Sequence, residues 1–178
     1  MEQNVNVWKA NLTNGLILGL AGIVYTLALY FLDQTFNKSL GYVFFLLSMV
    51  ILYFLIRSYR NNFLFGNISY GQAVGAGVII FLYYSVISGI FSYILFTVID
   101  TGLTGKLLAY VEDQMVKGGK VPAASMDTVM EFQKKFLKPE IMVPIGIISN
   151  MFFGTIISLL VSIFVRKEGN PLIETPQN

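Results

Sequence analysis

One stretch constrains the fold of this chain more than any other: residues 68–99, ISYGQAVGAGVIIFLYYSVISGIFSYILFTVI, which contain no charged side chain. An uncharged run longer than about eighteen residues predicts a transmembrane helix, because a helix in lipid satisfies its own backbone hydrogen bonds. Ser69 and Gln72 have the spacing of a capping box and are expected to begin this helix. At about 1.5 Å per residue, such a helix is longer than the hydrocarbon layer is thick and should tilt or project.

Three further apolar segments predict a multi-span membrane protein. Hydrophobic residues make up 55% of the 178 residues and charged residues only 12%, and the charged residues concentrate between the apolar segments and at the ends. The first segment is too long for the apolar core of a secretory signal peptide, which has about 7–15 residues, so we expect it to be retained. We predict an all-α fold, a four-helix transmembrane bundle in a single domain over residues 1–178. Its expected spans are residues 12–32, 40–56, 69–99 and 141–165.

The loop at residues 100–140 is expected to form two short amphipathic helices that lie against the membrane or each other. Apolar residues recur there at helical spacing until Gly118 and Gly119 interrupt the pattern. Ser125 is predicted to cap the second helix. Pro139 and Pro144 mark the entry to the last span, since proline is tolerated in the first turn of a helix. Residues 169–178 are expected to be a disordered tail.

The connections between spans predict their arrangement. A short turn over residues 33–39 makes the first two spans an antiparallel hairpin. The second span has few small residues and should be the most exposed to lipid. Every Arg lies on the side of the two termini, directly at span ends, which favours cytoplasmic termini, although lysines of the long loop argue against this. Asp33 and Asp100, at the loop ends of spans, are expected to be solvated boundary residues.

Composition limits the chemistry that the chain can perform. It contains no Cys and no His, and its net charge is only +2. Thiol nucleophiles, imidazole acids and bases, and the usual zinc and haem ligands are therefore absent, and nucleic acid is not an expected partner. We predict no catalytic, cofactor-binding or metal-binding residues, and no enzymatic activity.

Small and polar residues within the spans are the candidates for a functional role. In lipid there is little hydrophobic drive between helices, so small residues decide which helix faces pack closely. Asn150, Tyr83 and Tyr84 lie near the middle of spans and need hydrogen-bond partners there. The candidates for helix packing or for lining a polar cavity are Gly15, Gly19, Gly22, Gly71, Gly75, Tyr83, Tyr84, Ser85, Gly89, Gly146, Asn150, Gly154 and Ser158. The most specific expectation is contact between the Ser85–Gly89 and Asn150–Gly154 regions.

Several motifs resemble those of a known family. They are the early Asn14-Gly15, the I-S-Y-G-Q-A entry at residues 68–73, and Ile-Phe-Ser-Tyr at residues 90–93, followed by a loop with short helices. Over nearly its whole length the chain resembles the bacterial integral membrane family called domain of unknown function 4199, found mainly in Bacteroidota. The resemblance implies a four-span fold in the bacterial inner membrane and carries no established activity.

Two hypotheses for function follow from these features. The first is a non-enzymatic membrane protein that acts by binding in the bilayer, as an accessory subunit or a homo-oligomer, through its Gly/Ser helix faces or its amphipathic loop. The alternative is a transporter or channel component for a neutral or lipid-like molecule. The four predicted spans contain no charged residue, so proton coupling lacks a titratable group. A polar cavity that reaches Asn150 and Tyr83 would favour the alternative.

Overall fold

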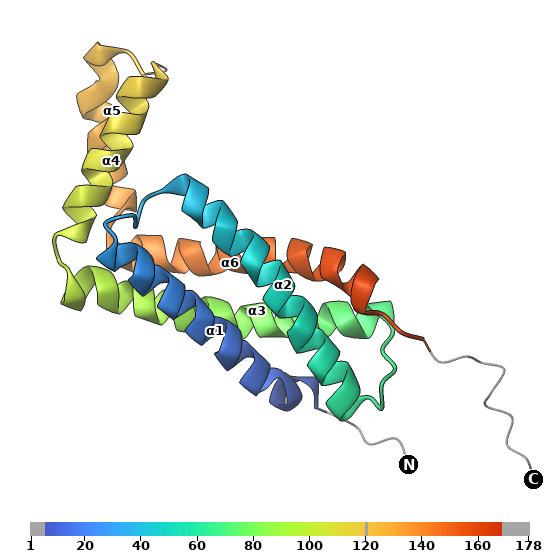
Figure 1. Cartoon of the computed structure of the whole chain (residues 1–178). Helices are drawn as coiled ribbons and strands as arrows, with labels where there is room; N and C mark the ends of the chain where they lie inside the picture. The colour runs from blue at the N-terminus through green and yellow to red at the C-terminus, as the bar shows by residue number, and fades with distance from the viewer. Residues whose placement is uncertain (1–5, 120, 169–178) are drawn as a thin grey trace, which may run out of the picture.

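A computed structural model describes residues 6–119 and 121–168, and these residues fold into helices that form a bundle with a lateral hairpin (Figure 1). The predicted tail at residues 169–178 lies outside the described residues. The helices are α1 (Val7–Phe31), α2 (Lys38–Phe63), α3 (Tyr70–Ile94) with its π-helical continuation η1 (Leu95–Ile99), α4 (Leu103–Gly118), α5 (Ala123–Phe136) and α6 (Pro139–Val165). The predicted all-α bundle with two short helices between the third and fourth spans is confirmed.

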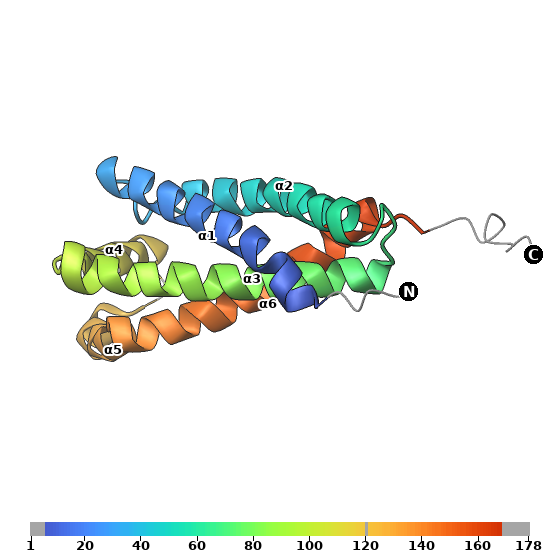
Figure 2. The ribbon, with the colours of Figure 1, turned by 90° about the horizontal axis from the view of Figure 1, so that it is seen from below.

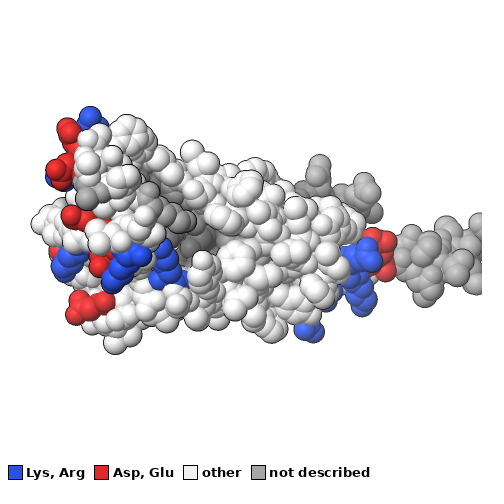
Figure 3. All heavy atoms as spheres, turned by 90° about the horizontal axis from the view of Figure 1, so that it is seen from above, with Lys and Arg blue, Asp and Glu red and all other residues white. Residues whose placement is uncertain are grey.

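Four of these helices are long and apolar enough to cross a bilayer: α1, α2, α3 with η1, and α6. Between the two ends of the bundle, the face displayed in Figure 3 is a band without charged side chains, and Lys, Arg, Asp and Glu gather at the two ends. This separation of charge from the long apolar helices identifies a multi-pass membrane protein. Helix α2 is longer than the predicted second span, because Arg57 and Arg60 continue the helix to Phe63 instead of starting a loop.

Helix α3 is the inner helix of the bundle. Its most extensive contacts are with α6 and α1, which lie on either side of it (Figure 2). Within the most apolar part of each long helix, 39% of the residues are buried in α3 and only 22% in α2. Both expectations, a central third span and a lipid-exposed second span, are confirmed. Helices α1 and α2 form the expected hairpin, but α1 packs more extensively against α3 than against α2.

The end of the bundle that carries the termini is closed by backbone hydrogen bonds. Ser69 and Gln72 form the predicted capping box at the start of α3. Just before it, Ile68 and Lys167 exchange two N–H to carbonyl hydrogen bonds of 2.8 and 3.0 Å, which tie the start of α3 to the end of α6. Arg60 Nη1 donates to the Val165 carbonyl at 2.9 Å, so α2 also holds the last turn of α6. These bonds satisfy carbonyls that the end of a helix leaves without partners.

The opposite end carries the α4–α5 hairpin, which is set at a steep angle to the long axis of the bundle (Figure 1). Gly119 adopts a left-handed conformation (φ 61°) that ends α4, as the predicted glycine break requires. The prediction for Ser125 is wrong: Pro122 precedes the first turn of α5, and the Ser125 N–H donates to the Pro122 carbonyl. Proline fixes the extended start of the helix without a side-chain cap.

The two prolines of α6 differ in their roles. Pro139 occupies the first turn, where its missing N–H is not needed. Pro144 lies inside the helix, so the prediction that both prolines belong to the entry holds for Pro139 only. Because Pro144 cannot donate, the carbonyl of Glu140 loses its helical hydrogen bond close to the α4–α5 hairpin.

Candidate functional site

The three glycines of α1 lie against α3. A Cβ atom added at Gly15 would overlap the Tyr83 side chain, and one added at Gly19 would come within 2.9 Å of Ile87 Cγ2. At Gly22 the added atom would lie 2.7 Å from Tyr84 Cε2. These glycines therefore let α1 approach α3 more closely than any larger side chain would allow.

The contact between α3 and α6 also depends on glycines. A Cβ added at Gly154 would overlap Phe81, and one added at Gly89 would lie 2.7 Å from Ile147 Cδ1. These two contacts lie on either side of the expected one: Phe81, which meets Gly154, is one turn before Ser85, and Ile147, which meets Gly89, is about one turn before Asn150. Side chains of each helix therefore pack against glycines of the other around the expected regions.

Gly77 is part of this contact, although it was not among the sequence candidates. Its added Cβ would lie 2.6 Å from Ser158 Oγ. Gly77, Phe81 and Gly89 stand four or eight residues apart, and this spacing is the signal that could have identified Gly77. Residues four apart on a helix form a continuous ridge that a neighbouring helix can follow.

Three candidate glycines lie away from helix contacts. A Cβ atom added at Gly71, Gly75 or Gly146 would meet nothing within 4 Å, so their predicted role in packing within the bundle is wrong. Gly71 and Gly75 are exposed on α3 beyond the ridge that meets α6. With Leu82 and Val86, which share this side of the helix, they form what we call the uncovered stripe of α3.

The polar candidates within the spans differ in how they use their hydrogen bonds. Ser85 Oγ donates to the Phe81 carbonyl, and Ser158 Oγ donates to the Gly154 carbonyl, each at 2.7 Å. Tyr83 is different, since its hydroxyl donates across the bundle to the Trp8 carbonyl on α1 at 3.3 Å. Asn150 is half-buried and makes no side-chain hydrogen bond to another described residue. The bonds of Ser85 and Ser158 therefore do not join helices to each other.

Tyr84 packs as an aromatic residue in the core of the bundle. Its ring stacks on Phe44 of α2 with a centroid separation of 6.1 Å and meets Phe81 edge-on at 5.7 Å. Since the same ring covers Gly22 of α1, Tyr84 is the point at which three helices meet.

Sequence reasoning missed a buried polar pair on α1. Asn11 is fully buried and Asn14 nearly so, and Asn14 Nδ2 donates to Asn11 Oδ1 at 3.0 Å. Asn11 Nδ2 in turn donates to the Val7 carbonyl, and Asn14 also reaches the Leu55 carbonyl of α2 at 3.5 Å. The spacing of two asparagines three residues apart, directly before Gly15, was the available signal.

Asp100 links three elements at the hairpin end of the bundle. Its carboxylate accepts hydrogen bonds from Lys106 Nζ at 3.0 Å, from the Gly102 N–H at 2.9 Å and from the Tyr30 hydroxyl of α1 at 3.4 Å. The hydrogen bond from Lys106 is the main reason that the pKa of Asp100 lies below its ordinary value of 3.8. Asp100 is thus a partly exposed residue at the end of the third span whose carboxylate also connects α4 and α1.

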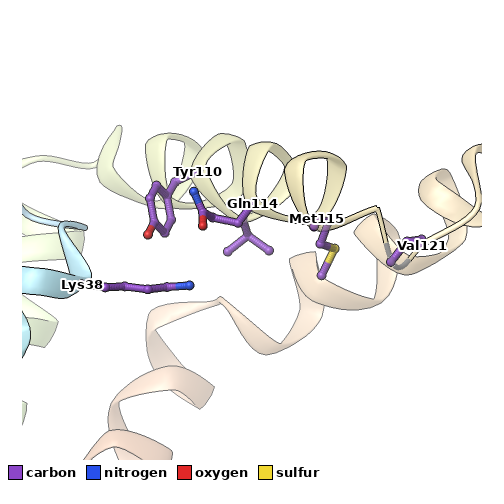
Figure 4. A pocket seen from close by; sticks show the side chains of 7 residues that line it. Lys38, Tyr110, Gln114, Met115 and Val121 are labelled. Atoms are coloured by element: carbon purple, nitrogen blue, oxygen red, sulfur yellow. The ribbon is translucent and has the colours of Figure 1, made fainter.

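A pocket of about 400 Å³ lies where the start of α2 meets α4. Lys38, Tyr110, Val111, Gln114, Met115, Gly118 and Val121 line it. Figure 4 shows the Lys38 side chain extending from α2 along the side of α4 that carries Tyr110 and Gln114, with Val121 at the far end. The described residues contain no group of three or more His, Cys, Asp or Glu side chains that could hold a metal ion.

Comparison with known proteins identifies one family. The family model described as "Protein of unknown function (DUF4199)" matches residues 13–167, which include all four long helices except the first residues of α1. No curated protein and no solved structure matches the chain.

Replacement of Gly154 by alanine tests the α3–α6 contact. The added methyl would lie 2.6 Å from Phe81 Cβ, which is fixed to the backbone, so we expect Gly154→Ala to lower the free energy of unfolding by about 1–3 kcal/mol. Gly146→Ala, on the same helix, adds its methyl in open space and should raise stability by up to about 1 kcal/mol. Unfolding in mixed micelles of increasing SDS content measures both values, and equal effects would contradict the packing assignment.

Acid should weaken the Asp100 cluster. A carboxylate whose pKa is lowered by folding stabilises the fold above its unfolded pKa, near 3.8, and this contribution is lost as the pH falls through the lower folded pKa. We therefore expect the melting temperature of the wild-type protein to fall more steeply below about pH 4 than that of Asp100→Asn. Lys106→Met should have the same effect as Asp100→Asn, since it removes the main cause of the shift. Parallel acid profiles of all three proteins would refute this role.

Proposed function

This chain belongs to the family of proteins of unknown function described as DUF4199, and we propose that it is a non-enzymatic membrane protein that acts by associating with another helix in the bilayer. The other helix would come from a second copy of the chain or from a partner for which the chain is an accessory subunit. The uncovered stripe of α3 is the observation that supports this proposal.

The stripe has the chemistry of the contacts inside the bundle. Gly71 and Gly75 are four residues apart, as Gly15 and Gly19 are on α1, where a helix lies directly against them. Glycines at this spacing allow two helix backbones to approach closely in lipid. Gly71 and Gly75 are exposed, and no heavy atom that a Cβ would meet lies within 4 Å of them, so this stripe offers a helix-sized contact that the chain itself leaves open.

The proposal of a non-enzymatic role rests on the sequence. The chain has neither His nor Cys, and the four predicted spans carry no charged residue that could act as an acid, a base or a nucleophile. The transport hypothesis requires a cavity that reaches Asn150 and Tyr83. The pocket beside Lys38 includes neither residue, and Tyr83 lies against α1. We therefore favour association over transport.

We further propose that the protein resides in a bacterial inner membrane with both termini in the cytoplasm. The terminal end of the bundle carries five positive residues in or next to the end portions of the long helices, and such residues favour the cytoplasmic side. They are Lys9, Arg57, Arg60, Arg166 and Lys167.

A reporter fused after Gly119, at the tip of the α4–α5 hairpin, tests this orientation. We expect an alkaline phosphatase fusion, which is active only outside the cytoplasm, to be active there. A green fluorescent protein fusion at the same position should stay dark, because it fluoresces only in the cytoplasm. The opposite pattern would place the hairpin inside the cell and the termini outside.

Bulky substitutions on the uncovered stripe should weaken association. We expect the double variant Gly71→Leu, Gly75→Leu to associate about tenfold more weakly than the wild-type chain, because leucine side chains keep the two backbones apart. Gly41→Leu is the matched control, since a Cβ at Gly41 also meets nothing within 4 Å but lies on α2. Energy transfer between labelled copies in vesicles measures self-association, and crosslinking in native membranes followed by mass spectrometry identifies a different partner.

Three results would contradict the proposal. The first is a wild-type chain that is strictly monomeric and free of partners in native membranes. The second is an equal loss of association in Gly41→Leu. The third is no loss in the double variant. Helix content by circular dichroism separates a loss of association from a loss of folding.

A further inference from the structure

The pocket beside Lys38 lies at the level where the spans leave the hydrocarbon layer. Helix α2 begins at Lys38 and enters its apolar part within a few residues, and α1 ends nearby at Phe31. Since lysine marks the boundary of a span, the Lys38 ammonium is placed at the level of the lipid headgroups.

Helix α4 forms the wall of the pocket from the water side. Figure 1 shows α4 running across the end of the bundle at a steep angle to the long helices. A bilayer crossed by those helices therefore has α4 lying along its surface. The side of α4 that lines the pocket faces the start of α2 (Figure 4), so the pocket opens at the membrane surface and not into the middle of the bundle.

The pocket wall is held in place by aromatic and aliphatic packing. The Tyr110 ring lies 5.8 Å from the Phe36 ring in the turn between α1 and α2. Phe36 and Leu107 pack in turn against a small core that contains the buried Leu95 and Leu103. These contacts hold the first part of α4, which carries Tyr110, beside the start of α2.

The chemistry of the lining matches an anionic amphiphile. Lys38 is exposed, and no salt bridge joins it to any residue in the described part of the chain, whereas Lys106 and Lys117 are paired with Asp100 and Asp113. The Gln114 amide adds a neutral hydrogen-bond donor next to this cation. Apolar side chains supply the remaining wall, among them Val111, Met115 and Val121.

We propose that this pocket binds one anionic phospholipid, with its phosphate at Lys38 and Gln114 and the upper part of an acyl chain against Met115 and Val121. The site is independent of the helix contact proposed for the uncovered stripe. It uses α2 and α4 instead of α3, so the failure of either proposal leaves the other intact.

Native mass spectrometry of the full chain with defined lipids tests this site. We expect phosphatidylglycerol to be retained in preference to phosphatidylcholine of the same acyl composition. Lys38→Gln should weaken the retention of phosphatidylglycerol about fivefold, which is the effect of one lysine near a membrane surface. Lys135→Gln removes the same charge from an exposed position of α5 that does not line the pocket, and it should leave retention unchanged.

A fluorescence measurement keeps the proposal testable if lipid is lost during ionisation. Trp8 is the single tryptophan and lies at the opposite end of α1, so a Trp8→Phe, Met115→Trp variant reports on the pocket alone. Brominated phosphatidylglycerol at low mole fraction should quench this tryptophan more than brominated phosphatidylcholine does. Lys38→Gln in the same background should remove the difference.

Several outcomes would overturn the proposal. Equal effects of Lys38→Gln and Lys135→Gln would mean that charge acts without a site. Equal quenching by the two brominated lipids would mean that the pocket does not distinguish an anion. If inorganic phosphate prevents quenching as well as unbrominated phosphatidylglycerol does, the ligand is a soluble phosphate and not a lipid.

Discussion

The structure depends on close approach of helix backbones at glycines on both sides of α3. In lipid, apolar side chains gain little by leaving the solvent, so tight packing has to supply the attraction between helices. Gly15, Gly19 and Gly22 bring α1 onto α3, and Gly77, Gly89 and Gly154 bring α3 and α6 together. Helix α2 makes less extensive contacts, and it is also the helix with the smallest buried fraction.

Polar groups complete this arrangement without placing charge in the core. The hydroxyls of Ser85 and Ser158 donate to carbonyls of their own helices, so these buried serines have hydrogen-bond partners without joining other helices. The Asn11 and Asn14 side chains are hydrogen-bonded to each other and to the backbone carbonyls of Val7 and Leu55. Ser162 Oγ is buried without a partner among the described residues, and nothing in the surrounding structure explains it.

The two ends of the bundle are built differently. At the terminal end, backbone bonds between Ile68 and Lys167 and the Arg60 guanidinium join three helices directly. At the other end, Asp100 connects α1 to α4, and the α4–α5 hairpin extends sideways from the bundle. The hydrogen bonds at the terminal end therefore fix the start of α3 beside the end of α6, and the hairpin end carries the pocket proposed for a phospholipid. The two proposed contacts, with a helix and with a phospholipid, use these separate parts of the molecule.

The sequence by itself determined the four spans, the central place of the third, the lipid exposure of the second and the capping box at Ser69. These properties follow from span length, hydropathy, the number of small residues in each span and local hydrogen bonding, all of which can be counted within one segment. Only the tertiary structure decided which small residues are covered. Residues four apart on a helix differ by about 40° in direction, so the row of candidates Gly146, Asn150, Gly154 and Ser158 turns by about 120° along α6. Its end near Ser158 meets α3 and its start at Gly146 does not. In the same way, a ridge through Gly77 and Gly89 meets α6, while Gly71 and Gly75 lie beside that ridge and remain open.

The pocket beside Lys38 could not be predicted from the sequence either. It joins residues more than seventy positions apart, which come together only where the α4–α5 hairpin lies beside the start of α2.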